Sequence, residues 1–500
     1  MTHKFPYHSG QKSRFSGSRG DILVSVIVFA AIALTVTLGM VNWGAAILSG
    51  IRTAQAREQA FQIAEAGVDY YRWHLAQFPT DYKDGTTTPG PYYHDFYDKN
   101  GTLVGQYALS ITPPPAGSTK VVITSTATTT AHPTIVRIIQ ATLAQPSLAQ
   151  YAVIADDFLR FGDGTVVYGP ISSNEGIHFD GVAYNIVSSA LATTTDPDVG
   201  SCSPSPACKT VWGVYTQSGT DDPRPPTPAN NRPDVFVAGR QYPTPAFPFA
   251  SLAVNLSSLL SIAAPGGVCS APACWAPSNS KGYYLHFNTN NTFDMYKVTA
   301  VRSAPSGCSG TQSQWGTWSV QTLSSKIGTY TVPTSGVIFV KDDLWVDGTV
   351  NGTRVTVAAA DIGQSDPNKY RNITINNDLM YTSYAGNDVI GLIAQNNINV
   401  GLVSADDLQI DAALVAENGR VGRFYYGSGC KIGGTNYHVR DTITLNGMIA
   451  TAIRYGFAYT DNTGYDTRNI NYDGNLLYSP PPSFPLASTQ YQTISWKQIR

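Results

Sequence analysis

The longest apolar stretch in the chain runs from Ile22 to Ile51 and contains no Asp, Glu, Lys or Arg. About 20 apolar residues cross a bilayer as a helix, whereas the apolar region of a removable signal peptide has only about 7–15 residues. We therefore predict a membrane-spanning helix. The segment from Arg52 to Phe78 adds charged residues and contains no proline. We expect one continuous helix over residues 21–78, apolar in its first half and amphipathic in its second.

Three runs with strand-like alternation follow, rich in Val, Ile, Thr and Tyr and bounded by Pro and Gly. They span Thr102–Thr112, Lys120–Thr128 and Thr134–Ala144. Thr80–Gly101 is polar and rich in Gly and Tyr, and we expect a connector there. Residues 79–150 are therefore predicted to form a small antiparallel sheet that covers the apolar stripe of the amphipathic helix.

From Tyr151 onward, a doublet of Asp or Asn recurs before short apolar strands. Asp and Asn favour turns, and the alternation that follows places one strand face inside. The spacing between doublets is irregular, which favours a parallel β-solenoid with variable loops, and a β-sandwich is the alternative. We assign residues 151–189 to its first part and 335–500 to its main part with a C-terminal cap. The doublets are Asp156-Asp157, Asp342-Asp343, Asn377-Asp378, Asn396-Asn397 and Asp406-Asp407.

Residues 190–334 interrupt this pattern. They contain a short helix candidate, Pro248–Ala264, and two strand candidates, Tyr283–Asn288 and Thr292–Thr299. We predict an insertion that folds against the solenoid edge. We expect the Pro-rich segment Tyr478–Pro485 and Trp496 to cover the open end of the sheet. The predicted fold class is α+β.

Composition agrees with β-structure rich in turns: charged residues are 13% of the chain, with 45 Gly, 31 Pro and 29 Tyr. The formal net charge is −2. A chain with this charge has no electrostatic basis for binding nucleic acid, so we expect no nucleic-acid partner.

The chain has six cysteines, two pairs of which are close in sequence. An even number behind a membrane segment indicates an oxidising compartment and disulfides. Free buried cysteines and a zinc site are the alternatives, but the spacing and the distance to the nearest His disfavour zinc. The candidate disulfide residues are Cys202, Cys208, Cys269, Cys274, Cys308 and Cys430.

Residues 1–20 are basic and contain no Asp or Glu. Positive charge before an apolar helix keeps that end in the cytoplasm. The segment is predicted either to act as a plain orientation signal or to be a leader that is cut between Gly20 and Asp21.

A basic leader, a glycine and an uncut apolar helix resemble a type IV prepilin. The helix segment Ala64-Glu65-Ala66-Gly67 resembles the corresponding motif of PilX-like minor pilins and pilus-assembly proteins. The Tyr-Asp, Pro-Pro-x-Phe-Pro and terminal Trp features near the C-terminus resemble β-rich proteins associated with that group. Pilins usually carry Phe or Met as the first residue and Glu as the fifth residue after cleavage, where this chain has Asp21 and Ser25. The resemblance implies a pilin-like head and other pilins or pilus-assembly proteins as partners of the helix.

The Asp doublets are the best candidates for catalysis, because glycosidases need two carboxylates at a defined separation. Each doublet lies at a repeating turn, however, and Asn396-Asn397 shows that Asn replaces Asp there. We therefore predict no enzymatic activity, no catalytic residues and no cofactor. The Asp-rich turns leave weak calcium binding open, although no twelve-residue calcium loop is present. Exposed aromatic residues are compatible with a surface or glycan ligand.

These observations predict a non-enzymatic, exported protein associated with type IV pili, with a minor-pilin role at the tip, in priming or in adhesion. The helix would lie in the inner membrane as a single pass, with the body exported and reaching the cell surface in a pilus. One alternative is an anchored adhesin or envelope protein that never enters pili. Another is an anchored β-helix enzyme that acts on polysaccharides.

Overall fold

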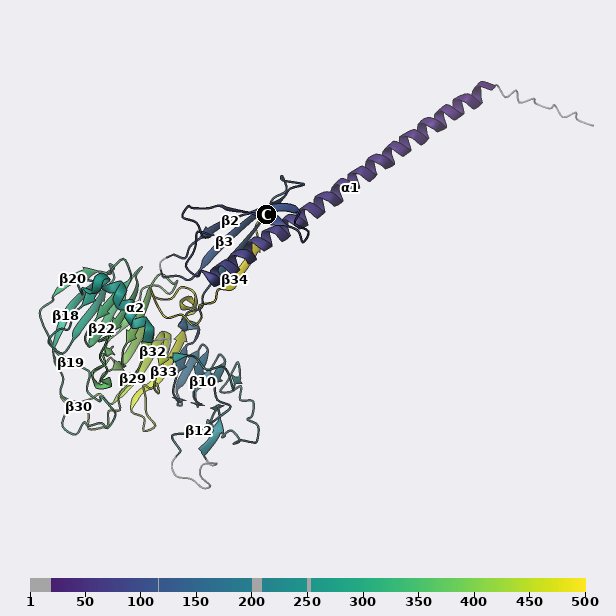
Figure 1. The fold of residues 1–500 in the computed structure, drawn as a ribbon. Coiled ribbons are helices and arrows are strands. Elements are labelled where there is room, and N and C mark those ends of the chain that lie inside the picture. The colour runs from purple at the N-terminus through teal and green to yellow at the C-terminus, as the bar shows by residue number, and fades with distance from the viewer. Residues whose placement is uncertain (1–18, 116, 200–208, 250–252) are drawn as a thin grey trace, which may run out of the picture.

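The computed structural model describes residues 19–115, 117–199, 209–249 and 253–500. It has three parts: a long helix, a small sheet beside the C-terminal half of that helix, and a large β-rich body (Figure 1). The α+β class predicted from the sequence is confirmed. Within these described ranges the α-helices are α1 (Arg19–Gln77) and α2 (Ala253–Ala263).

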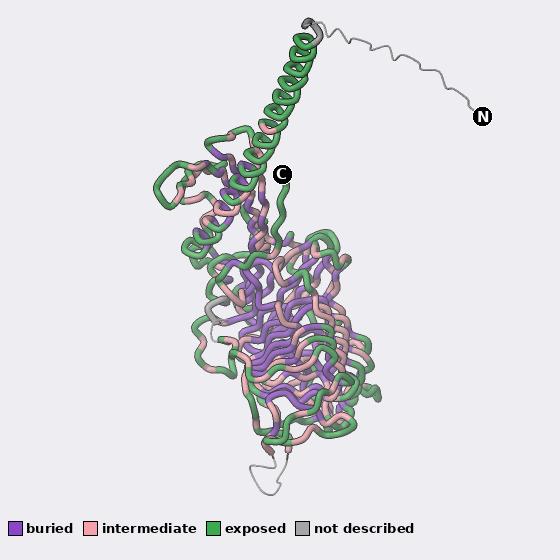
Figure 2. Tube along the Cα trace, turned by 90° about the vertical axis from the view of Figure 1, so that its right-hand side faces the viewer, coloured by how far each residue is buried: buried purple, intermediate pink, exposed green. Residues whose placement is uncertain are grey.

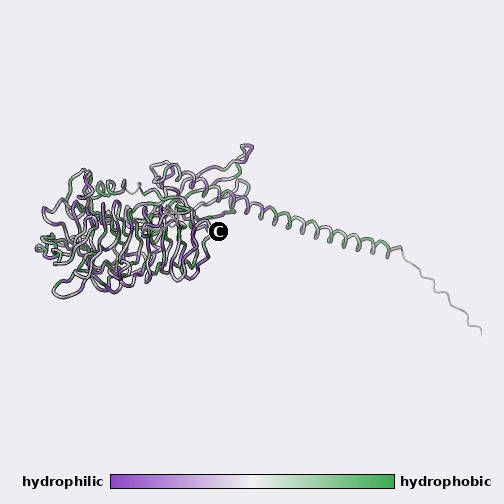
Figure 3. Tube along the Cα trace, turned by 90° about the horizontal axis from the view of Figure 1, so that it is seen from below, coloured by the Kyte–Doolittle hydropathy of each residue, from purple (hydrophilic) through white to green (hydrophobic). Residues whose placement is uncertain are grey.

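The two halves of α1 have different surroundings. The N-terminal half projects away from the rest of the molecule, and none of its most apolar window is buried (Figures 1 and 3). Phe29 and Trp43 there are 72% and 70% exposed. The C-terminal half packs on the small sheet through a stripe with helical spacing: Ala56, Ala60, Ile63, Ala64, Gly67, Val68, Tyr71 and Leu75.

The small sheet, here called the head sheet, has five strands in the order β1-β2-β3-β4-β34. All neighbours pair antiparallel. The last strand comes from the C-terminus of the chain, and its Trp496 packs edge to face on Phe61 of α1. The strands are β1 (Tyr92–Tyr97), β2 (Leu103–Thr112), β3 (Val121–Thr129), β4 (Arg137–Ala144) and β34 (Gln492–Gln498).

Two sequence expectations are corrected here. The segment 80–101 was expected to be a connector, but it contains β1, which pairs with β2. Residues 335–500 were all assigned to the body, but β34 belongs to the head sheet. The body is therefore an insertion between β4 and β34, which are adjacent strands of one small sheet.

The body consists of coils stacked through parallel strands. Two long ladders run through it, and Figure 2 shows their buried strands as parallel rows. The first ladder contains β16 (Cys274–Trp275), β21 (Val337–Val340), β23 (Arg354–Ala359), β26 (Val389–Ala394), β28 (Asp407–Ala416), β32 (Val439–Thr451), β5 (Val153–Ala155), β8 (Ile171–Ser173), β11 (Val187–Ser189) and β15 (Arg240–Gln241). The second contains β17 (Tyr283–Asn288), β22 (Leu344–Val350), β25 (Leu379–Tyr381), the first halves of β28 and β32, β33 (Gly464–Tyr472), β7 (Thr165–Tyr168) and β10 (Val182–Ala183).

A third ladder completes each coil, and it is interrupted. On one side it contains β24 (Ile373–Thr374), β27 (Ile398–Val400) and β29 (Val421–Arg423), and it ends at a bridge between Gly422 and Gly456. On the other side β6 (Leu159–Phe161), β9 (Ile177–Phe179) and β14 (Val214–Tyr215) form a separate sheet. Among the described residues, no strand pairing joins residues 455–457 to β6.

The coils do not follow the order of the sequence. The chain enters the body at β5, which pairs with β32 from the far end of the sequence. Likewise β7 pairs with β33. We call this junction between the 153–189 coils and the 337–472 coils the seam. Two ladders cross the seam and the third does not.

The interior of the coils is one apolar cluster drawn from all three ladders. The first ladder is buried on its outer face as well, against α2, the short 3₁₀ turn Leu148–Gln150, Leu476 and Phe484. Strands buried on both faces read as continuous apolar runs rather than as alternating ones. Val337–Val340 and Val389–Ala394 are two such runs, and every residue in them is buried.

The doublets predicted to form turns lie at the corners that precede strands, where they hydrogen-bond to neighbouring coils. Asp343 accepts a hydrogen bond from the backbone N–H of Asn372 (2.8 Å). The side chain of Asn372 in turn accepts one from the N–H of Asn397, which accepts one from Arg420 (2.9 Å). At the corners, these side chains therefore accept hydrogen bonds from the backbone of the next coil, in place of the backbone carbonyl groups that accept them within the strands.

The insertion at 190–334 connects the two ends of the body. Its first part pairs at one end, through β15 with β11. The chain then passes α2 and reaches the opposite end, where β17 pairs with β22. The predicted strand pair forms: β17 and β18 are antiparallel. Its other strands are β12 (Thr193–Thr195), β13 (Thr210–Trp212), β18 (Thr292–Val301), β19 (Val320–Leu323) and β20 (Gly328–Thr331). Outside the insertion, β30 (Lys431–Ile432) and β31 (Thr435–Asn436) form a short hairpin.

The Pro-rich C-terminal segment covers the outer face of the first ladder and not the open end of the sheet, which corrects the prediction from the sequence. A Cβ at Gly391 would meet Pro481 at 2.8 Å, so the segment needs a glycine there. The Arg354 side chain donates to the carbonyl oxygens of Ser479 (2.8 Å) and Pro480 (2.6 Å), and to that of Gly117 (2.8 Å) beside the head. Arg354 therefore connects head, body and C-terminal segment.

Gly67 determines how closely α1 approaches the head sheet. A Cβ at this position would meet Tyr107 Cδ2 at 2.8 Å and would overlap Ser125 Oγ. Both neighbours belong to buried parts of β2 and β3, so they have little room to move. The close packing of helix on sheet thus requires a residue without a side chain.

We predict that Gly67→Val weakens the docking of α1 on the head by about 1–3 kcal/mol, the usual range for an overfilled core. The change should lower the thermal unfolding midpoint of the full chain in detergent and expose the α1–head junction to limited proteolysis. Asp69→Val, on the exposed side of the same turn, is the matched control. Equal effects of the two variants would contradict the packing role of Gly67.

Candidate functional site

The residues singled out in α1 occupy two different environments. Gly20 and Asp21 lie in the first turns of the helix, and residues 1–18 of the leader lie outside the described residues. In the motif, Ala64 and Gly67 are buried against the head, whereas Glu65 and Ala66 are half-buried. The motif therefore has a packing role in this structure, and its pilus-specific role stays a prediction.

The described residues form two disulfides, Cys269–Cys274 and Cys308–Cys430. The first joins neighbours in sequence, as the spacing suggested. The second has a sequence separation of 122 and attaches the loop before β19 to the loop after β29. Cys202 and Cys208 lie outside the described residues.

A groove of about 1330 Å³ lies at the seam, where the third ladder is interrupted. Its walls come from the corner Asp157–Thr165 on one side and from residues 453–468 on the other, and residues 217–219 and 312–313 contribute to its rim. Phe161 and Tyr455 pack together beneath it, with ring centroids 5.3 Å apart. The interior is thus closed across the seam, while the surface above it is hollow.

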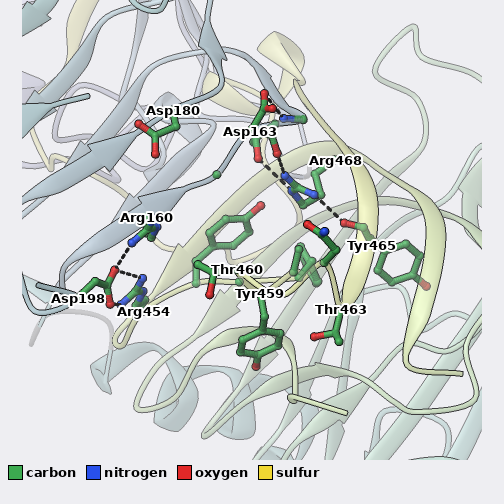
Figure 4. Close-up of a pocket in the computed structure, with 18 of the residues that line it drawn as sticks. Arg160, Asp163, Asp180, Asp198, Arg454, Tyr459, Thr460, Thr463, Tyr465 and Arg468 are labelled. Carbon is green, nitrogen blue, oxygen red and sulfur yellow. Dashed lines mark hydrogen bonds and ion pairs between the residues drawn. The ribbon is translucent and has the colours of Figure 1, made fainter. Parts of the chain in front are cut away.

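An ion-pair cluster bridges the seam at one side of the groove (Figure 4). Asp198 Oδ2 accepts hydrogen bonds from Arg160 (2.9 Å) on β6 and from Arg454 (2.7 Å), and Asp198 Oδ1 accepts from Arg454 (2.8 Å). Hydrogen bonds from Arg454 and then from Arg160 hold the pKa of Asp198 at about 2. Asp198 therefore attaches one half of the body to the other.

Arg468 fills the seam on the second side of the groove. Its guanidinium donates to the carbonyl oxygens of Asp163, Tyr465 and Asp466, and to Thr165 Oγ1 (3.0 Å). It forms no ion pair with any described residue. The side chain thus satisfies three backbone acceptors next to the point where the pairing of β33 with β7 begins.

His178, Asp196 and Asp198 place possible metal-ligand atoms within 4.8 Å of one another. His178 is fully buried, and its Nε2 lies 2.9 Å from Asp180 Oδ2. Both oxygens of Asp198 already accept hydrogen bonds from guanidinium groups, however. The positive charges of Arg160 and Arg454 would also repel a metal cation at this position. We therefore assign this trio to the ion-pair network and not to a metal.

The groove collects five lining carboxylates, so the enzyme alternative can be tested against its geometry. Asp157 accepts backbone hydrogen bonds from Phe158 and Arg454, and Asp180 accepts one from Gln217. A glycosidase acid needs a raised pKa. Here hydrogen bonds from His178 and Gln217 outweigh desolvation and lower the pKa of Asp180, and that of Asp198 is also lowered. These carboxylates are arranged as structural acceptors.

Sequence reasoning identified Asp157 as a turn residue but not the groove itself. Arg160, Asp198 and Arg454 stand in unrelated local patterns. These three side chains come into contact because β5 pairs with β32, and no local sequence pattern predicts that pairing. The sequence indicates only that residues on both sides of the insertion share one fold, because apolar runs after Asx doublets occur on both sides.

The sequence matches no protein-family model and is similar to no curated protein. Among solved structures, one likeness is to the competence-associated pilin ComZ from Thermus thermophilus. It has 15% identity and a TM-score of 0.26, and it covers 89% of this chain and 98% of that chain. A TM-score at this level does not establish a shared fold.

We predict that Asp198→Asn destabilises the body by about 1 kcal/mol, near the upper limit for partly exposed ion pairs. A depressed carboxyl pKa contributes stability above its unfolded value, and that contribution disappears as the pH falls from about 4 to about 2. The gap in unfolding free energy between wild type and variant should therefore shrink as the pH falls from about 4 to about 2.

The measurement is urea unfolding followed by tryptophan fluorescence across that pH range. Asp221→Asn, an exposed residue without an ion pair in the described chain, is the control and should leave stability unchanged. A gap that is independent of pH would show that Asp198 does not act through its charge.

Proposed function

We propose that this protein is a non-enzymatic, exported, pilus-associated protein of the minor-pilin or pilus-assembly type. The observation that carries the proposal is the division of α1. Its C-terminal half is built into the head, and its apolar N-terminal half contacts nothing in the described chain.

An apolar surface of this size is unstable in water and needs lipid or other apolar helices around it. The apolar run is long enough to span a bilayer as a single pass. In a bundle of similar helices, the same surface would be buried by its neighbours. One segment therefore serves both an inner-membrane stage and an assembled stage in a pilus.

The position of the body supports a place at the end of a filament. The body is inserted between β4 and β34, so two chain crossings attach it to the head. It extends from the head away from the exposed half of α1 (Figure 1). Its bulk would crowd repeated neighbours, which favours a tip, priming or adhesive role over a repeating subunit.

The second candidate is a single-pass adhesin or envelope protein whose anchor is never cut. It keeps the same helix and the same body, and it differs only at the N-terminus. The two candidates therefore make opposite predictions about Gly20.

We expect mass spectrometry of the protein from its native membrane to find Asp21 as the N-terminal residue, because a leader peptidase would cut after Gly20. Gly20→Asp should block the cut. Gly17→Asp, which changes the same leader by the same substitution, should leave it intact. An uncut chain that starts at residue 1 or 2, and is the same in all three forms, would favour the permanently anchored adhesin.

A further inference from the structure

The two sides of the seam groove differ in charge. Asp198 forms ion pairs with both Arg160 and Arg454 on one side, and Tyr459 and Thr463 lie on the other (Figure 4). On the Tyr459 side the groove is also lined by Gln312, Ser313, Asn397, Arg420 and Phe424. That set contains a cation and neutral hydrogen-bonding groups, but no carboxylate.

Arg420 is the cation on that side, and its charge is uncompensated. It is half-buried and forms no ion pair with any described residue. Its Nη2 is buried without a hydrogen-bond partner, and its Nη1 is 3.4 Å from Tyr459 Oη, at the limit of a hydrogen bond. The guanidinium lies over the Phe424 ring at 4.3 Å, which fixes its plane.

The surrounding groups do not supply an anion. Glu417 is near in sequence, but its pKa is raised to about 8 by burial alone, with no contribution from an arginine. Asn397 uses its side-chain oxygen to accept from the backbone N–H of Arg420 (2.9 Å). A partly buried guanidinium without a partner is unfavourable, and a planar carboxylate satisfies it with two parallel hydrogen bonds.

We propose that the seam groove binds an acidic oligosaccharide, with the carboxylate of one uronic acid residue on Arg420. The neighbouring sugar hydroxyls would meet neutral donors and acceptors along the rim, namely Gln312, Ser313, Thr460, Asn462, Thr463 and Ser218. Tyr459 offers a ring beside the cation for a sugar face. The inference gives the adhesive role a ligand class, but it does not depend on whether α1 enters a filament.

The charge pattern separates this ligand from other anions. Nucleic acid and other polyphosphates carry a charge at every unit and need many lysines or arginines. The groove is lined by five carboxylates as well as by four arginines, and three of those arginines are engaged by Asp198 or by backbone carbonyls. A ligand with a charge at isolated positions and hydroxyls between them fits this lining better.

The test is calorimetric titration of the full chain in detergent with three probes: an oligogalacturonate hexamer, a neutral galacto-oligosaccharide hexamer and a hexaglutamate peptide. We expect the acidic sugar to bind. Arg420→Gln should weaken this binding about tenfold or more, as loss of a charge-assisted pair requires. Arg420→Lys keeps the charge without the planar fork and should give an intermediate affinity.

Arg224→Gln removes an exposed arginine outside the groove and should leave binding unchanged. Thermal unfolding of each variant shows that a lost affinity is not a lost fold. No binding of the acidic hexamer, or binding that Arg420→Gln leaves unchanged, would overturn the proposal. Equal, Arg420-dependent binding of hexaglutamate would replace the sugar with an acidic peptide. None of these outcomes bears on cleavage at Gly20.

Discussion

The parallel pairing of β5 with β32 is the contact on which the rest of the structure depends. It joins the first coils of the body to the last ones across nearly the whole length of the body. Together with the pairing of β7 with β33, it holds the two sets of coils in one body, and without both pairings the insertion would connect two separate pieces. Long-range pairing of this kind orders a large loop before it gains contacts, so we expect the seam to form late in folding.

The seam also explains where the candidate binding surface lies. Two ladders continue across it and keep the apolar interior closed, whereas the third stops at Gly456 and resumes at β6. Side chains bind backbone groups across this gap: Arg468 donates to the carbonyl oxygen of Asp163, and Asp157 accepts from the backbone N–H of Arg454. The interruption of the third ladder therefore leaves a groove that is lined largely by polar groups. The same surface leaves the Arg420 guanidinium without an anion.

Local patterns in the sequence predicted many of the elements of the fold, but they did not predict which distant strands pair with one another. The apolar run and the absence of proline up to Pro79 predicted α1 closely, because both signals are local. The Asx doublets predicted the corners for the same reason. The return of β34 to the head and the order of the coils were missed, since pairing partners far apart leave no local trace. The candidate disulfide residues were named from the sequence, but the Cys308–Cys430 bond needed the fold.

The order of the coils is tested most directly by cysteine cross-linking on the outer face of the second ladder. Thr444, Asn469, Val166 and Val182 lie side by side on consecutive coils. We predict a disulfide between Val166→Cys and Asn469→Cys, detected by mass spectrometry, because paired strands are about 4.8 Å apart. Val166→Cys with Val182→Cys should also cross-link. Val166→Cys with Thr444→Cys, one coil farther away, should not. A cross-link to Thr444→Cys in place of Asn469→Cys, or none across the seam while the 166–182 pair forms, would contradict the seam.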